Sequence, residues 1–251
     1  MSSRHDALPS RAPLIVAGVC LALFAALTAS SLFIDVAPIG PQGSSVGLSS
    51  INGAVFATLG SNDLADKTSD LLLVLSVLVC GAFAALGLTQ LARTRSLSGV
   101  DPALIRLALA YLTLAVLYVG FEFVTLNYAP VLDEGQLKSS FPSSHTLATV
   151  AVFAMSPITL RALGANPQTT NPKLCNPATP SIAGAMSAVF ILAAVVLRVL
   201  SGQHWLTDVI AGVLLALCVT ALYAWSVEAC RPDPTLRACH STGVKRGKHA
   251  R

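Results

Sequence analysis

The sequence predicts an all-α fold, a polytopic membrane protein built as a bundle of six transmembrane helices. Of its 251 residues, 54% are hydrophobic and 11% are charged, whereas soluble domains carry about a quarter charged residues. The apolar residues gather in six long runs, near the ~20 residues that cross a bilayer as a helix. We expect a cytoplasmic N-terminal segment, 1–12, a six-helix membrane domain, 13–226, and a basic cytoplasmic tail, 227–251.

The first span is expected over residues 13–34, and its length favours a retained helix over a cleaved signal peptide, whose apolar core is usually ~7–15 residues. Residues 35–69 are predicted to form a polar loop. Within this loop, the mildly apolar residues 46–59 are too short to span the membrane, and are either an interfacial helix or an ordinary loop. The other spans are expected over residues 71–91, 104–125, 144–160, 182–200 and 205–225.

The basic residues predict the orientation of these spans. Six spans place both ends of the chain on one side of the membrane, and Lys and Arg favour the cytoplasmic side. The opposite side carries only Lys67 and Lys138, beside several carboxylates. We therefore expect both termini to be cytoplasmic and the protein to be integral to a bacterial plasma membrane. The side of the termini carries Arg4, Arg11, Arg93, Arg95, Arg161, Lys173, Arg231, Arg237, Lys245, Arg246, Lys248 and Arg251.

Residues 198–208 place an arginine, a histidine and an aspartate within this apolar sequence. Charged groups at membrane depth are costly, so we interpret them as functional. His204 and Asp208 are four residues apart and would share one face of a helix, where Asp208 could accept a hydrogen bond from one ring nitrogen and leave the other free. Ser201-Gly202 predicts a turn before that helix. Arg198 suits a phosphoryl group because its guanidinium can hold two oxygens.

A second polar stretch, residues 141–146, precedes the fourth predicted span. It offers the hydroxyls of Ser143 and Ser144 and the ring of His145 where a helix should begin. A helix start is a ready site for an anion, although a serine there can also cap the helix. Two histidines can divide phosphoryl transfer, because one attacks phosphorus and the other protonates the leaving oxygen. We expect both stretches on the outer side of the membrane.

Pro142-Ser143-Ser144-His145, followed by Arg198-x5-His204-x3-Asp208, resembles the second and third signature motifs of the type 2 phosphatidic acid phosphatase (PAP2) superfamily. The resemblance implies His204 as the nucleophile, Asp208 as the residue that orients it, and His145 as the general acid. It also implies that Arg198, Ser143 and Ser144 bind the phosphate, with no metal and no cofactor. Ser144 stands where the family usually has glycine, and Leu197 stands where it usually has serine.

The first motif of the family, a Lys, then six residues, then Arg-Pro, departs further. The nearest match ends at Ala129-Pro130 and has Glu122 at the lysine position, so both cations are missing. Lys138 is the only positive charge in that loop. It either replaces the missing cations in binding substrate or is a solvated charge near Glu134.

We therefore expect a PAP2-type phosphoric ester hydrolase, a lipid phosphatase acting on a lipid or isoprenyl phosphate monoester or pyrophosphate through a phosphohistidine intermediate. Two alternatives remain: a lipid head-group phosphotransferase and a non-catalytic lipid-phosphate-binding membrane protein. The expected partners are the lipid phosphate and the bilayer, and no nucleic acid. The sequence leaves the identity of the lipid and the oligomeric state open.

Overall fold

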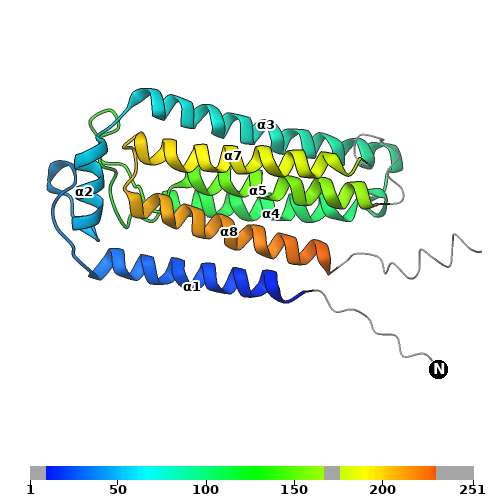
Figure 1. Ribbon diagram of the computed structural model, residues 1–251, viewed down its shortest axis with the longest axis horizontal. Coiled ribbons are helices and arrows are strands. Elements are labelled where there is room, and N and C mark those ends of the chain that lie inside the picture. The colour runs from blue at the N-terminus through cyan, green and yellow to red at the C-terminus, as the bar shows by residue number, and fades with distance from the viewer. Residues whose placement is uncertain (1–9, 167–175, 230–251) are drawn as a thin grey trace, which may run out of the picture.

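The computed structural model describes residues 10–166 and 176–229, and this part of the chain is helical apart from loops and isolated β-bridges (Figure 1). Six of its helices are long and apolar enough to cross a membrane. The predicted all-α fold with six spans is confirmed. The helices are α1 (Ala12–Phe33), α2 (Ser49–Leu59), α3 (Asp63–Thr94), α4 (Pro102–Glu122), α5 (Ser144–Ala165), α7 (Ala178–Leu200) and α8 (Leu206–Glu228).

The six long helices lie side by side, and the short helix α2 lies at one end of the bundle (Figure 1). The connections α1–α3, α4–α5 and α7–α8 are at this end too, because successive long helices run in opposite directions. The start of α1 and the end of α8 lie at the opposite end. The two polar stretches predicted to carry the site, residues 141–146 and 198–208, therefore lie at the end of the bundle that carries α2.

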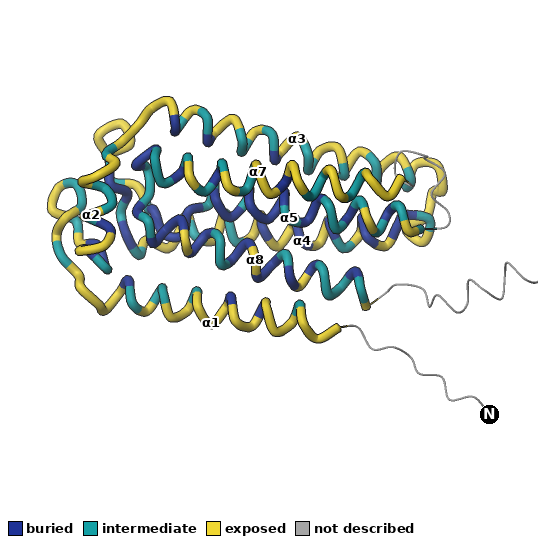
Figure 2. The backbone as a smooth tube through the Cα atoms, viewed as in Figure 1, coloured by how far each residue is buried: buried dark blue, intermediate teal, exposed yellow. Residues whose placement is uncertain are grey.

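Helices α5 and α8 form the centre of the bundle. Over half of the residues in their apolar windows are buried, 56% in each, against 6–17% for the other four spans. They pack against each other, α5 also packs against α7, and α1 packs along α8 (Figure 2). The outer helices turn apolar side chains away from this core, as a lipid-facing surface requires. The core residues include Leu107, Leu114, Leu147, Val150, Met155, Leu215, Ala216 and Val219.

Helix α8 approaches the start of α5 closely at Gly212. A Cβ atom at this position would lie 2.6 Å from the carbonyl oxygen of Ser143 and 3.0 Å from Cβ of Thr146. The backbone N–H of Ser143 also donates a hydrogen bond to the carbonyl of Asp208, at 2.9 Å. Glycine is therefore needed where these two helices meet.

Helix α3 begins at Asp63 rather than at residue 71, so the predicted start of the second span was wrong. The side chain of Asn62 accepts a hydrogen bond from the backbone N–H of Ala65, at 3.0 Å, and so caps the helix. Asp63 and Asp66 in the first turn favour the same start, because the N-terminus of a helix attracts negative charge. The polar first turns of α3 thereby extend the bundle toward α2.

The mildly apolar stretch between the first two spans forms helix α2, so the alternative of an ordinary loop was wrong for these residues. Asp35 holds the start of the helix by accepting hydrogen bonds from the backbone N–H of Ser50, at 2.7 Å, and from the hydroxyl of Ser49, at 3.0 Å. These bonds lower the pKa of Asp35 below its ordinary value. Asn52 then joins α2 to α8 through two hydrogen bonds with Thr207.

Candidate active site

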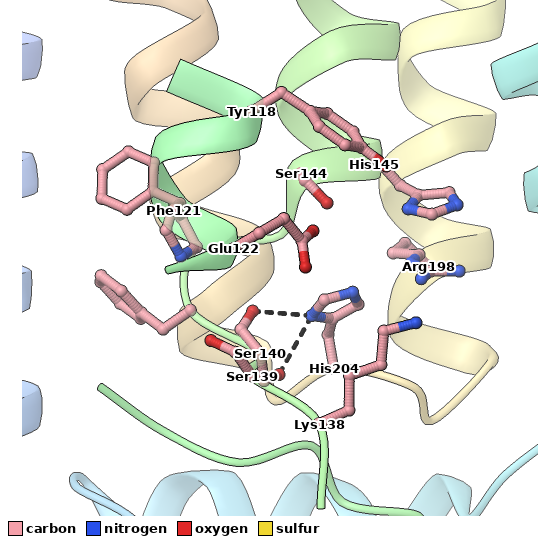
Figure 3. A pocket seen from close by; sticks show the side chains of 12 residues that line it. Tyr118, Phe121, Glu122, Lys138, Ser139, Ser140, Ser144, His145, Arg198 and His204 are labelled. Carbon is pink, nitrogen blue, oxygen red and sulfur yellow. Dashed lines mark hydrogen bonds between the residues drawn. The ribbon is translucent and has the colours of Figure 1, made fainter. Parts of the chain in front are cut away.

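A pocket opens at the end of the bundle where α4 stops and α5 starts (Figure 3). Its walls are the last turns of α4, the loop before α5, the first turn of α5, the end of α7 and the turn into α8. Five predicted site residues meet there although they are far apart in the sequence: Lys138, Ser144, His145, Arg198 and His204. The pocket is also lined by Tyr118, Phe121, Glu122, Ser139, Ser140, Phe141 and Pro142.

The ring of His204 is held through its Nδ1 atom by Ser140. Nδ1 lies 2.9 Å from the carbonyl oxygen of Ser140 and 3.1 Å from its hydroxyl oxygen (Figure 3). A carbonyl oxygen can only accept, so Nδ1 carries the hydrogen and Nε2 has the free lone pair. Within the described residues, Nε2 makes no hydrogen bond. The arrangement leaves a nucleophilic nitrogen available on a fixed ring.

Asp208 does not form the expected direct hydrogen bond with His204. Its Oδ2 lies 4.0 Å from Nδ1, and the hydroxyl of Ser140 donates a short hydrogen bond to this carboxylate instead. The reason is the start of α8. Leu206 is its first residue, so His204 precedes the helix, while Asp208 turns back and accepts the backbone N–H of Trp205 at 3.1 Å. Ser140, which the sequence did not single out, therefore lies between the two predicted partners.

The turn from α7 into α8 has the predicted form. Gly202 has a φ of +67°, and a Cβ atom there would lie 2.5 Å from the carbonyl oxygen of Gly60. Glycine satisfies both constraints, since it alone adopts a positive φ readily and lacks a side chain. The turn ends α7 just after Arg198 and brings His204 back into the pocket.

His204 is largely buried, with 10% of its side chain exposed, and its pKa is lowered well below its ordinary value. Removal from water is the main cause, because it disfavours the charged imidazolium. The positive charges of Arg198 and of a protonated His145 act in the same direction. The ring is therefore neutral near pH 7, which is the form that can attack phosphorus.

Arg198, in the last turn of α7, is buried with 6% of its surface exposed. Its Nη1 donates a hydrogen bond to Oδ1 of Asp66 on α3, at 2.9 Å, and Oδ1 of Asp70 lies 3.9 Å away. Its Nε has no hydrogen-bond partner within residues 10–166 and 176–229. Because a guanidinium has five N–H donors, Arg198 can keep Asp66 and still offer donors to an anion.

His145, in the first turn of α5, also meets α3. Its Nε2 lies 3.3 Å from Oδ1 of Asp70. Asp70 thus sits between His145 and Arg198, and contributes a carboxylate that sequence analysis missed. The signal was present, since Asn62 followed by Asp63 and Asp66 is typical of a helix start. Extending the second span back to residue 63 would have placed Asp66 and Asp70 on a helix near the site.

The two serines before His145 take different positions. Ser143 is fully buried and caps α5, because its hydroxyl oxygen accepts the backbone N–H of Thr146 at 3.4 Å. It does not line the pocket, whereas Ser144 does (Figure 3). The geometry therefore gives Ser143 the capping role and leaves Ser144 with a side chain in the pocket.

Lys138 and Glu122 are the charged residues that line the pocket from the loop before α5 and from the end of α4. The ammonium of Lys138 lies 3.2 Å from Oδ2 of Asp133, with both side chains more than half exposed. Figure 3 shows this ammonium directed toward His204 and Arg198, and the Glu122 carboxylate also pointing into the pocket. The Glu122 carboxylate makes no hydrogen bond or ion pair with any of the described residues. The described residues contain no group of three or more His, Cys, Asp or Glu that could hold a metal ion.

A comparison with protein-family models gives a match that covers both motifs. Residues 120–232 match the PAP2 superfamily. The matched range contains every site residue predicted from the sequence, so the resemblance to this superfamily is confirmed. Asp66 and Asp70 lie outside the PAP2 match, on α3.

The bundle is also similar to a solved PAP2 protein. The crystal structure of a transmembrane PAP2-type phosphatidylglycerolphosphate phosphatase from Bacillus subtilis aligns with a TM-score of 0.52 and 19% sequence identity. The alignment covers 85% of this chain and 94% of that chain. At this identity the similarity concerns the fold. No curated protein matches the sequence.

Proposed function

We propose that the protein is a membrane phosphatase that hydrolyses a lipid phosphate through a phosphohistidine intermediate. The observation that carries this proposal is the meeting of His204, His145 and Arg198 in one pocket. A neutral imidazole with a free Nε2, a second imidazole beside a carboxylate, and a buried guanidinium can serve phosphoryl transfer as nucleophile, general acid and phosphate ligand. The PAP2 match over both motifs supports the same reaction class.

In the first step, Nε2 of His204 attacks phosphorus and the bond to the lipid oxygen breaks. The leaving alkoxide takes a proton from the imidazolium of His145. Arg198 and the side chain of Ser144 hold the phosphoryl oxygens, with the backbone at the start of α5 and the ammonium of Lys138 nearby. Positive charge on the phosphorylated ring of His204 is stabilised by Ser140 and, through its hydroxyl, by Asp208.

In the second step, water attacks the phosphohistidine. His145, now neutral, accepts a proton from this water, the P–N bond breaks, and His204 returns to its starting state. Phosphate leaves with His145 protonated again. An alcohol in place of water would give head-group transfer, and a protein that only binds would perform neither step.

We also propose that both termini face the cytoplasm of a bacterium and that the pocket opens on the outer side of the plasma membrane. Support comes from the distribution of charge along the described residues. At the pocket end, carboxylates outnumber Lys67 and Lys138. The helix ends at the opposite end carry Arg11, Arg93, Arg95, Arg106 and Arg161.

A substrate panel tests the proposed reaction. The purified protein in mixed micelles is incubated with phosphatidic acid, phosphatidylglycerol phosphate or an isoprenyl pyrophosphate, and both free phosphate and lipid products are measured. The proposal expects phosphate release that His204→Ala abolishes. Exchanged lipid without phosphate release would indicate a transferase, and neither product would indicate a binding protein. Acid-labile labelling of the protein by a phosphorus-32 substrate checks the intermediate.

A further inference from the structure

The pocket has two walls of opposite character. On one side lie Arg198, Lys138 and the start of the 22-residue helix α5, which together favour negative charge. On the other side lies the last turn of α4, with Tyr118 and Glu122 four residues apart. A phosphate dianion is attracted to the first wall and repelled by the carboxylate of the second.

The wall formed by α4 favours a cation for three independent reasons. Glu122 is the last residue of this 21-residue helix, where unpaired carbonyls carry partial negative charge. Its carboxylate is exposed in the pocket and makes no hydrogen bond or ion pair with any residue in the described ranges. Tyr118 adds an aromatic ring one helical turn earlier, and such rings attract ammonium groups. In Figure 3 both side chains lie on the pocket side of α4, with the carboxylate directed toward His204.

The charge balance of the site points the same way. Arg198 is already paired with Asp66 and lies near Asp70, and Lys138 is paired with Asp133. A phosphate dianion alone would add two negative charges beside the unpaired Glu122. A phosphate ester that also carries an ammonium brings a partner for this carboxylate.

Building on the proposed function, we propose that the preferred substrate is a phosphate ester with an ammonium group a few bonds from phosphorus. The phosphoryl group lies against Arg198 and His204, and the ammonium lies between Glu122 and Tyr118. Two lipid classes have this chemistry. In a phosphoethanolamine diester the ammonium is in the head group, and in a long-chain 2-amino-alkyl phosphate it is in the lipid part.

The chemical step balances for either class. Nε2 of His204 attacks phosphorus, the bond to the lipid oxygen breaks, and this oxygen takes the proton of His145. Water then cleaves the P–N bond. A phosphoethanolamine diester yields diacylglycerol and phosphoethanolamine, and a 2-amino-alkyl phosphate yields an amino alcohol and phosphate.

Binding is measured first, so that the result does not depend on turnover. The protein carrying His204→Ala is titrated with three matched short-chain ligands: dihexanoyl phosphatidic acid, dihexanoyl phosphatidylethanolamine and a 2-amino-alkyl phosphate. We expect at least one amine-bearing ligand to bind about tenfold or more tightly than phosphatidic acid. Adding Glu122→Gln should remove this preference, whereas Glu134→Gln, a nearby exposed carboxylate outside the pocket, should not.

Turnover of the same three lipids by the protein with His204 intact gives the second readout. Glu122→Gln should lower kcat/KM for the amine-bearing lipid about tenfold or more, and should maintain or raise kcat/KM for phosphatidic acid because a negative charge is removed beside its phosphate. Glu122→Lys should reverse the preference. Equal binding of all three ligands, or equal loss in Glu122→Gln, would overturn the proposal. Absence of turnover with amine-selective binding would instead overturn only the proposed hydrolysis.

Discussion

The carbonyl oxygen of Ser140 lies 2.9 Å from Nδ1 of His204, so the residue that orients the ring comes from the loop before α5. The hydroxyl of the same serine donates to Asp208. Through this one residue the loop reaches both the proposed nucleophile and a carboxylate that is fully buried in α8. The loop therefore helps to form the proposed active site and is more than a connection between spans.

Replacing Ser140 by alanine should slow turnover without abolishing it. The change keeps the carbonyl that fixes the tautomer and removes the hydroxyl that links the ring to Asp208. A hydrogen bond to a charged group contributes about 1.5–3 kcal/mol, so kcat should fall by roughly 10- to 150-fold if the contact tightens in the transition state. Steady-state kinetics should show KM nearly unchanged. Ser139→Ala, whose hydroxyl donates to the carbonyl of Val124, should have a much smaller effect, and equal effects would contradict the role of Ser140.

Replacing His145 by alanine should have an effect that depends on the leaving group. A general acid contributes about 10²- to 10⁴-fold, but a nitrophenolate leaves without needing a proton. Turnover of a lipid phosphate should fall by about that factor, while turnover of p-nitrophenyl phosphate should fall far less. His204→Ala should abolish both, because the nucleophile is needed for either substrate. Asp70→Asn should follow the His145 pattern with a smaller loss, since the carboxylate lies 3.3 Å from Nε2 of His145. A uniform loss in His145→Ala would exclude it as the general acid.

The stability of the protein should depend on pH through His204. Burial lowers its pKa in the folded state, while the unfolded chain should titrate near ~6.5. Below that pH the unfolded chain binds a proton that the folded protein does not, so stability is lost as pH falls. The temperature of thermal unfolding in detergent should therefore fall as the pH is lowered from about 7 to about 5, and His204→Gln should reduce this fall. An identical pH dependence in the two proteins would show that His204 is not buried as a neutral ring.

Lys138 can be tested against Lys67, the other lysine at the pocket end. Lys138 lines the pocket, while Lys67 is exposed on α3. If its ammonium contacts the phosphate more tightly in the transition state, Lys138→Ala should lower kcat/KM by roughly 10- to 150-fold. Lys67→Ala should leave kcat/KM nearly unchanged. Small and equal effects would mean that Lys138 is a solvated partner of Asp133 and that Arg198 is the cation of the site.

The orientation in the membrane can be tested with single cysteines in a background without native cysteines. Ser61 and Gln136 are exposed at the pocket end, and Ser98 is exposed at the opposite end. An impermeant thiol reagent should label Ser61→Cys and Gln136→Cys in intact cells and should label Ser98→Cys only after permeabilisation. Gly243, a further position for a cytoplasmic probe, lies outside the described residues. The reverse pattern would place the pocket on the cytoplasmic side.

The sequence predicts much of this architecture because apolar runs near 20 residues in length have few other solutions. It also predicts five side chains that line the pocket: the two motifs contain Ser144, His145, Arg198 and His204, and Lys138 is the positive charge in the loop before them. Ser140 was missed because it orients His204 through its backbone carbonyl, which residue type does not reveal. Asp66 and Asp70 were missed because α3 extends beyond its apolar run. The expected direct hydrogen bond between His204 and Asp208 does not form because α8 starts at Leu206, which leaves His204 outside the helix.

Gly212 links the spacing of the proposed catalytic groups to the packing inside the bundle. Any side chain there would meet the backbone at Ser143, one residue before the helix that carries His145. Relief of that overlap would move α5 away from α8, and the two imidazoles would separate with them. A substitution at this glycine should thus impair heat resistance and turnover together, whereas changes at Asp70 or Ser144 should affect turnover more than heat resistance. A loss of both heat resistance and turnover would show that buried packing at Gly212 sets the distance between His145 and His204.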